Sequence, residues 1–291
     1  MALSNPLIRE EYIEQEYFFR VWRERMRENV PSQEFLKTIQ EEILSTCQLP
    51  VAIDILRTEV LHSGRMGAAM KRMSHYFTAF QTFVVDRAEN DTSRFEQITA
   101  LQILEREARY RAAGVSPAGL FMFQFECIAR NRLGYHDGLE AIASDPVCDE
   151  AWQSWIRNLK LQLGVRDLAE LVYRASENFR LRRASVADAE SATHPARAAG
   201  LFGNQEGRIA RANIGRDPAY FFAALQRQLS YPSVPLPKQP EPETLPPVLG
   251  GRLARIEQRL KLLEMEQKGG IDLSRYSGLH RSTEDPADTS S

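Results

Sequence analysis

The amino-acid sequence predicts an all-α fold, an irregular multi-helix bundle followed by a Pro-rich linker and a short amphipathic, coiled-coil-like helix. Three observations support this prediction. Apolar residues in the first 230 positions recur at spacings of three and four, the period of a helix with one buried face. Residues that start and stop helices separate these segments. Residues 231–248 then contain seven prolines, which disfavour helix and favour an extended spacer.

This pattern divides the chain into four predicted parts. Large apolar residues and helix signals extend to about residue 230, and two glycines at 269 and 270 end the last apolar repeat. The parts are an all-helical domain at 1–230, a linker at 231–249, an amphipathic helix at 250–268 and a disordered tail at 269–291.

The composition is that of an ordinary globular chain. Of 291 residues, 43% are hydrophobic and 26% are charged, and the net charge is −2. Because so small a net charge gives no general attraction to polyanions, we expect neither nucleic acid nor a membrane as a partner. No apolar run approaches the roughly 20 residues that span a bilayer, and the N-terminus lacks an export-signal pattern. We therefore predict a cytoplasmic protein.

The three cysteines, Cys47, Cys127 and Cys148, form no CxxC pair. An odd number of widely separated cysteines argues against a disulfide framework and against a thiolate metal site. We expect all three to be small core residues.

Four helices are predicted in the first third of the chain. The first ends where Asn29, Val30 and Pro31 interrupt the apolar repeat, and Ser32 is expected to cap the second. Pro50 suits a first helical turn and Gly64 a helix exit, which defines the third. A seam of methionine and phenylalanine predicts one long fourth helix. The expected ranges are 7–28, 33–46, 50–64 and 66–84.

Five further helices are predicted in the rest of the body. Ser93 and Glu96 have the spacing of a capping box, and a capping residue followed by proline opens three other segments. The alternating Phe121, Phe123 and Phe125 also fit a strand, but the flanking start and stop signals favour a helix. Residues 184–207 are rich in Ala, Ser and Gly and are expected to form a long loop. The predicted helices are 93–114, 116–134, 145–164, 167–183 and 217–229.

Few residues suggest a metal or a catalytic site. Glu59 and His62 are spaced by three on a predicted helix, the arrangement by which ferritin-like bundles present a carboxylate and an imidazole to iron. A di-iron site needs a second such pair, so we predict no metal and no other cofactor. The sequence also lacks the GxSxG, HExxH and EF-hand patterns. The aromatic run at 121–125 is expected to be core, with a hydrophobic ligand pocket as the alternative.

The segment from Gly200 to Arg216 interleaves glycines with three arginines. Glycine lets a backbone approach an anion closely, and arginine offers forked donors to phosphate or carboxylate. The segment matches neither the phosphate-binding loop pattern nor the dinucleotide-binding pattern. Its arginines can also pair with acidic helices, such as the one bearing Glu10 and Glu14. The possible anion-binding residues are Arg208, Arg211 and Arg216.

The last helix carries a heptad seam with complementary flanking charges. Leucine and isoleucine step by four and three, which fixes the register. In a parallel pair each g residue meets the e residue five positions later on the partner, and both such pairs join an arginine to a glutamate. Leu253 and Leu260 occupy a, Ile256 and Leu263 occupy d, Arg252 and Arg259 occupy g, and Glu257 and Glu264 occupy e.

Together these features favour a non-enzymatic helical scaffold or adaptor. The tethered C-terminal helix is expected to bind a second copy of the chain or another protein, because two heptads are too short for a stable isolated helix. The alternative is an all-α enzyme or small-ligand-binding protein, with a ferritin-like metal site or a hydrophobic pocket, localised by the same helix.

Overall fold

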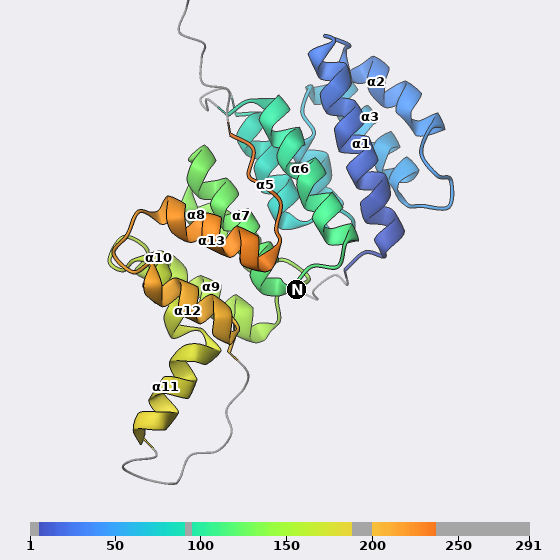
Figure 1. Cartoon of the computed structure of the whole chain (residues 1–291). Helices are drawn as coiled ribbons and strands as arrows, with labels where there is room; N and C mark the ends of the chain where they lie inside the picture. Colours follow the sequence, from blue (N-terminus) through green and yellow to red (C-terminus); the bar gives the residue numbers. More distant parts are fainter. Residues whose placement is uncertain (1–5, 91–94, 188–199, 237–291) are drawn as a thin grey trace, which may run out of the picture. The chain divides into compact units, whose positions relative to one another are not determined.

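The computed structural model describes residues 6–90, 95–187 and 200–236, and within these ranges the fold is all-helical (Figure 1). The described residues form thirteen α-helices, one 3-10 turn and two isolated bridges, with no strand. The prediction of an all-helical body is confirmed. The predicted C-terminal helix and tail, and the linker from residue 237 onward, lie outside the described residues.

The first five helices precede residue 91 and the other eight follow residue 94. The first group, with its 3-10 turn, is α1 (Arg9–Arg27), α2 (Ser32–Thr38), η1 (Ile39–Glu41), α3 (Leu49–Ser63), α4 (Gly67–Arg72) and α5 (Ala79–Ala88). The second group is α6 (Gln97–Ala112), α7 (Pro117–Asn131), α8 (Tyr135–Ala143), α9 (Glu150–Gln162), α10 (Leu168–Arg174), α11 (Glu177–Ala187), α12 (Asn204–Ala212) and α13 (Pro218–Leu229).

One continuous apolar core joins these helices, and α7 lies at its centre. Helix α1 packs along α6, α7 packs against α8 and α13, and α12 packs against α10, α11 and α13 (Figure 1). Residues 118–128 of α7 are all buried. The phenylalanine alternation that also fits a strand is therefore part of a helix that is covered on every side. No helix in the described ranges has both the length and the apolar character needed to cross a bilayer.

Several predicted helix ends are confirmed by their caps. The Ser116 hydroxyl accepts a hydrogen bond from the Gly119 N–H at 3.1 Å, and Pro117 is the first helical residue of α7. Asp217 caps α13 through the Ala219 N–H at 2.8 Å. Gly64 ends α3 with φ of 73°, the left-handed conformation that glycine adopts without steric cost.

The predicted long helix over 66–84 is wrong, because it is two helices. Residues 73–78 form turns between α4 and α5. Thr78 and Gln81 form a reciprocal capping box, in which each side chain bonds the other residue's backbone N–H, and this starts a new helix. The methionine and phenylalanine seam is buried as expected, but two separate helices bury it.

The predicted helix over 33–46 is also shorter than expected. Helix α2 ends at Thr38 and continues only as the 3-10 turn. The Thr38 hydroxyl donates to the Phe35 carbonyl at 3.0 Å, a local bond that competes with regular helix. The chain then turns so that the backbone N–H of Gln48 donates to Glu11 Oε1 at 2.7 Å.

Two predicted helix starts are wrong. Asp145 and Pro146 do not open α9, which begins at Glu150 after Asp149 caps it through the Trp152 N–H at 2.8 Å. Helix α6 begins at Gln97 with Glu96 as its N-cap and no side-chain cap bond, later than the predicted capping box. Ser93 lies outside the described residues.

The second half of the body also differs in its helix count. The predicted helix over 167–183 is split into α10 and α11, because Glu177 N–H donates to the Phe202 carbonyl at 2.8 Å and the chain bends there. Helix α8 is absent from the sequence prediction, and it contains Gly138. This glycine lies so close to Ile128 and Phe83 that an added Cβ would fall 2.5 Å from Ile128 Cδ1.

The predicted loop over 184–207 is too long at both ends. Helix α11 continues to Ala187, and α12 begins at Asn204. Gly207, which the prediction placed in the loop, is buried within α12. Residues 188–199 lie outside the described ranges.

The described chain ends on a segment that is tied to the body. Residues 231–236 follow α13 without regular structure, yet Tyr231 is buried and its hydroxyl donates to Glu126 Oε2 at 2.8 Å. Asn131 Nδ2 donates to the Pro235 carbonyl at 3.0 Å. The start of the predicted linker therefore packs on α7.

Candidate functional site

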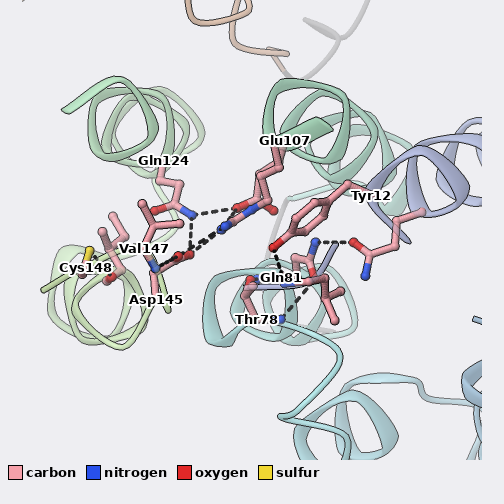
Figure 2. Close-up of polar contacts among 12 residues, drawn as sticks. Tyr12, Thr78, Gln81, Glu107, Gln124, Asp145, Val147 and Cys148 are labelled. Atoms are coloured by element: carbon pink, nitrogen blue, oxygen red, sulfur yellow. Dashed lines mark hydrogen bonds and ion pairs between the residues drawn. The ribbon is translucent and has the colours of Figure 1, made fainter. Parts of the chain in front are cut away.

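A closed group of charged side chains lies between α6, α7 and the loop that follows α8 (Figure 2). We call Glu107, Arg111, Gln124 and Asp145 the buried charge cluster. Arg111 Nη1 donates to Asp145 Oδ1 at 3.2 Å, and its Nη2 contacts Asp145 Oδ2 as well. The same Nη2 donates to Glu107 Oε1 at 2.9 Å, one turn earlier in α6. Gln124 Nε2 donates to Glu107 Oε1 at 2.7 Å and to Asp145 Oδ2 at 3.3 Å.

Burial controls the electrostatics of this cluster. The side chain of Arg111 is 1% exposed, and those of Glu107 and Asp145 are fully buried. Burial raises the pKa of Glu107, because a carboxyl away from water is more stable uncharged, and the nearby Arg111 offsets only part of this effect. Burial alone would lower the pKa of Arg111, but the two carboxyl groups outweigh it and the pKa is raised.

The cluster continues into a polar layer beside α1 and α5. The Arg111 guanidinium lies 5.8 Å from the centre of the Tyr12 ring, and Gln81 Nε2 donates to Gln15 Oε1 at 3.1 Å (Figure 2). On the other side, burial raises the pKa of the Cys148 thiol to about 12. Because its ionisable side chains are covered, the cluster holds helices together and offers no open surface to a substrate.

Two more buried glutamates each bind a tyrosine hydroxyl. Glu11 accepts from Tyr76 at 2.9 Å, and Glu126 accepts from Tyr231. Burial raises the pKa of both tyrosines well above the ordinary value, and the neighbouring glutamate adds to the effect. These contacts join segments that are far apart in sequence.

The aromatic run in α7 is core, as predicted. Phe121, Phe123 and Phe125 are buried, and the Phe121 ring lies 5.0 Å from Trp155 and 5.8 Å from Trp152, centre to centre. Phe202 closes the group at 5.2 Å from Trp152. These rings pack against one another beside α7. Cys127 and Cys148 are also buried, whereas Cys47 is only partly covered.

Glu59 and His62 are not brought together with further metal ligands. Glu59 pairs with Arg72 of α4, and this hydrogen bond lowers the pKa of Glu59. His62 is exposed in the last turn of α3. Among the described residues no three His, Cys, Asp or Glu side chains are grouped closely enough to hold a metal ion.

Two glycines of the glycine and arginine segment, Gly200 and Gly207, serve close packing. A Cβ at Gly207 would lie 2.2 Å from Ser176 Oγ, and one at Gly200 would lie 2.5 Å from the Glu177 nitrogen. Backbone bonds hold the segment to the α10–α11 junction, among them one from Leu201 N to the Ala175 carbonyl at 3.0 Å. These glycines therefore let protein atoms approach, and any anion would have to bind through the arginine side chains.

The three arginines of this segment do not pair with acidic helices. Arg208, Arg211 and Arg216 are exposed, and their side chains have no ion pair or hydrogen bond within the described ranges. The acidic α1 uses its carboxylates elsewhere: Glu14 accepts from Leu44 N at 3.4 Å and Glu16 from Arg109 at 2.7 Å. The arginines are thus available to an external anion.

A surface pocket of about 330 Å³ lies where the ends of α1, α3 and α5 meet the starts of α2, α4 and α6. Its lining includes Trp22, Val60, Met66 and Glu89. Glu89 accepts from the Met66 and Gly67 N–H groups at 2.5 and 3.0 Å, and burial nevertheless raises its pKa. The pocket therefore pairs an apolar floor with a half-buried carboxyl group. No sequence motif marks it, because its residues come from separate elements.

The predicted partner-binding residues lie outside the described residues. They are Arg252, Leu253, Ile256, Glu257, Arg259, Leu260, Leu263 and Glu264.

Comparisons with known proteins identify no family for the chain. No protein-family model, curated protein or solved structure matches it.

Proposed function

We propose that the chain is a non-enzymatic helical adaptor that acts in the cytoplasm. Its body presents a surface to a partner, and its tethered C-terminal helix self-associates in parallel or docks on a similar helix of another protein. The observation that carries the proposal is the agreement between the apolar seam, from Leu253 to Leu263, and the charges that flank it.

The distribution of charged groups between the interior and the surface of the body supports this function. The two most deeply buried acids among the described residues, Glu107 and Asp145, both contact Arg111 and so fix the position of α6 against the loop after α8. Exposed arginines at 208, 211 and 216 remain available for contacts with other molecules. This distribution favours a rigid platform with an interacting surface over a catalytic cleft.

The seam is tested by changing it in the full-length chain. Leu260→Asp places a charge in the apolar seam, whereas Gln258→Asp adds the same charge at position f, on the opposite side of the helix. We expect the first variant to lose oligomers and the second to keep them in light scattering coupled to size exclusion, measured across concentration. A monomeric wild type would remove self-association, and an oligomer that survives Leu260→Asp would assign the interface to the body.

The flanking charges are tested by a swap. Arg252→Glu with Arg259→Glu sets like charges opposite Glu257 and Glu264 in a parallel pair, at a cost of about 0.2–0.5 kcal/mol per contact. Adding Glu257→Arg and Glu264→Arg restores opposite charges. Weaker association in the first variant and recovery in the second would support a parallel pair, and no recovery would argue against that register.

The pocket favours a second candidate function, the binding of a small molecule. Glu89 offers its carboxyl group to an amine or hydroxyl, and Trp22 and Val60 offer an apolar wall. Native mass spectrometry of purified protein would detect a retained small molecule, and Val60→Trp, which fills the pocket, should abolish it. If no mass is retained, or if Val60→Trp retains the same mass, this candidate is removed.

A further inference from the structure

Two loops of the body are held side by side by one aspartate. The first, 163–167, joins α9 to α10, and the second, 213–217, joins α12 to α13. Asp167 Oδ1 accepts from the Ala169 N–H at 3.2 Å and so caps α10, while its Oδ2 accepts from the Gly215 N–H at 2.9 Å. Figure 1 shows α10, α12 and α13 next to one another at this end of the body.

Further backbone bonds hold each loop in place. The N–H groups of Val165 and Arg166 donate to the Gln162 carbonyl at 3.1 and 3.0 Å. The Arg216 N–H donates to the Asn213 carbonyl at 3.1 Å, and Asn213 Nδ2 donates to the Ile209 carbonyl at 2.8 Å. Side chains on these loops are therefore presented from an ordered backbone, which lowers the entropy cost of binding.

The two loops, which the Asp167–Gly215 bond joins, and the helix ends beside them carry exposed aliphatic and arginine side chains. Val165 is 85% exposed, Leu161 is 78% exposed and Ile214 is 41% exposed. Large aliphatic side chains that gather at one place on a surface indicate a binding site more strongly than scattered ones. We call the set the two-loop patch, and it comprises Leu161, Val165, Arg166, Arg211, Ile214 and Arg216.

The three arginines of the patch differ in their acidic neighbours. Arg211 and Arg216 have no carboxylate partner in the described part of the chain. Arg166 lies 3.3 Å from Glu170, but that carboxylate is shared with Arg174 at 2.6 Å. The two aspartates at the patch, Asp167 and Asp217, accept backbone N–H groups as helix caps. Arginine is enriched at protein interfaces, and the exposed aliphatic side chains add apolar area that a partner can cover.

We propose that the two-loop patch binds an acidic amphipathic helix of a partner protein. Aliphatic residues of that helix pack on Leu161, Val165 and Ile214, and its carboxylates pair with Arg211 and Arg216. The chain's own C-terminal helix is a poorer occupant, because residues 250–268 contain five basic and three acidic residues. Nucleic acid would match the arginines but would leave the aliphatic side chains unused. The proposal deepens the adaptor function, on which it rests, by assigning the partner surface of the body.

The test is a selection from a display library of helical peptides of about four turns, with acidic, basic, polar and aliphatic residues all allowed at every position. The full-length protein is the bait. We expect selected peptides to be rich in Asp, Glu and aliphatic residues, and to lose binding by about tenfold or more on Val165→Asp or on Arg211→Glu with Arg216→Glu. Binding should weaken as salt is raised from about 50 to 300 mM.

Two exposed substitutions outside the patch serve as controls. Arg227→Glu, a charge reversal on α13, and Leu181→Asp, a change on α11, should leave peptide binding unchanged. Replacing the acidic residues of a selected peptide with lysine should restore its binding to the Arg211→Glu, Arg216→Glu variant, because the charge pairs are re-formed in reverse. All variants should unfold at the wild-type denaturant concentration, since the changed side chains are exposed.

The outcomes decide the proposal and leave the adaptor function separately testable. Selected peptides that bind all patch variants equally, or a selection without acidic enrichment, would overturn it. Tight binding of a single-stranded oligonucleotide that competes with the peptides would also overturn it and assign the arginines to nucleic acid. If the Leu260→Asp chain is monomeric and still binds the peptides, the two-loop patch binds independently of the C-terminal helix. If the patch variants still form oligomers but the selected peptides do not distinguish them from the wild type, self-association is supported and the patch proposal is rejected.

Discussion

Arg111 and Arg211 are the same residue type in two amphipathic helices, but their surroundings differ completely. Arg111 lies between two carboxyl groups with its side chain 1% exposed, whereas Arg211 is exposed and has no ionic partner among the described residues. The difference comes from which elements pack against each helix. Helix α6 meets Gln124 of α7 and the loop that carries Asp145, while α12 turns Gly207 and Ala210 inward and its arginines outward. A buried arginine fixes the fold and an exposed one is available for recognition.

The largest expected effect is the loss of the buried arginine. Arg111→Met keeps much of the side-chain volume but leaves Glu107 and Asp145 without their cation, which costs about 3–5 kcal/mol of unfolding free energy. Urea denaturation followed by circular dichroism measures it. A loss below about 1 kcal/mol would show that the buried charge cluster does not hold the fold, and the contrast with α12 would then fail.

A smaller but substantial effect is expected where α12 meets the α10–α11 junction. Gly207→Ala drives a methyl group into Ser176 and Asn178, and overpacking of this kind costs about 1–3 kcal/mol. Gly203→Ala is the matched control, because its nearest contact is the flexible end of Glu206. Both are compared by thermal and urea unfolding. Equal effects of the two changes would contradict the close packing that positions Arg211.

A pH series tests whether Glu107 is uncharged in the folded state. Because its pKa is raised, the stability that Glu107 contributes is fully present below its unfolded pKa of about 4.3 and is lost as pH rises through the folded pKa. Glu107→Gln cannot titrate. The unfolding free energy of the wild type should therefore fall relative to the variant as pH is raised from about 4 to 8. A rise of the wild type relative to the variant would mean that Glu107 is charged in the fold.

The smallest expected effect is the same substitution at the exposed site. Arg211→Met should change the unfolding free energy by no more than about 0.5 kcal/mol, because the side chain contacts no described carboxylate. Because Arg111→Met and Arg211→Met make the same chemical change, the difference between their unfolding free energies under identical conditions reports the effect of the surroundings. A loss of about 2 kcal/mol or more would place Arg211 in the structural framework instead of on a binding surface.

Local signals in the sequence predicted the fold class and many helix ends. Ser116 with Pro117, and Asp217 with Pro218, act within one helical turn, so their effect is readable from neighbouring residues. Sequence reasoning failed where a distant element decided the outcome. Asp145 has the pattern of a helix cap, but Arg111, 34 residues away, binds it instead. The stretch rich in Ala, Ser and Gly that ends at Gly207 predicted a loop, because Ser176, which requires a small residue at 207, is not its neighbour in the chain.

The candidate sites also combine features that the sequence reveals with features that depend on distant contacts. The exposed arginines at 208, 211 and 216 were found from composition, yet their setting depends on Asp167 joining two loops, a contact that spans 48 residues. The pocket beside Trp22 draws on the ends of separate helices and has no local signature. The heptad seam of the C-terminal helix remains a sequence prediction.

The segment after α13 acts as a mechanical anchor. Asn131 donates to the Pro235 carbonyl at 3.0 Å, Arg106 donates to Ser233 Oγ at 2.9 Å, and the Tyr231 hydroxyl binds Glu126. A pull on the chain beyond residue 236 therefore reaches α6 and α7, the helices that carry the buried charge cluster, before it reaches α13. Tension applied to the chain beyond residue 236 would be resisted at these buried contacts, and α13 would be shielded from unwinding.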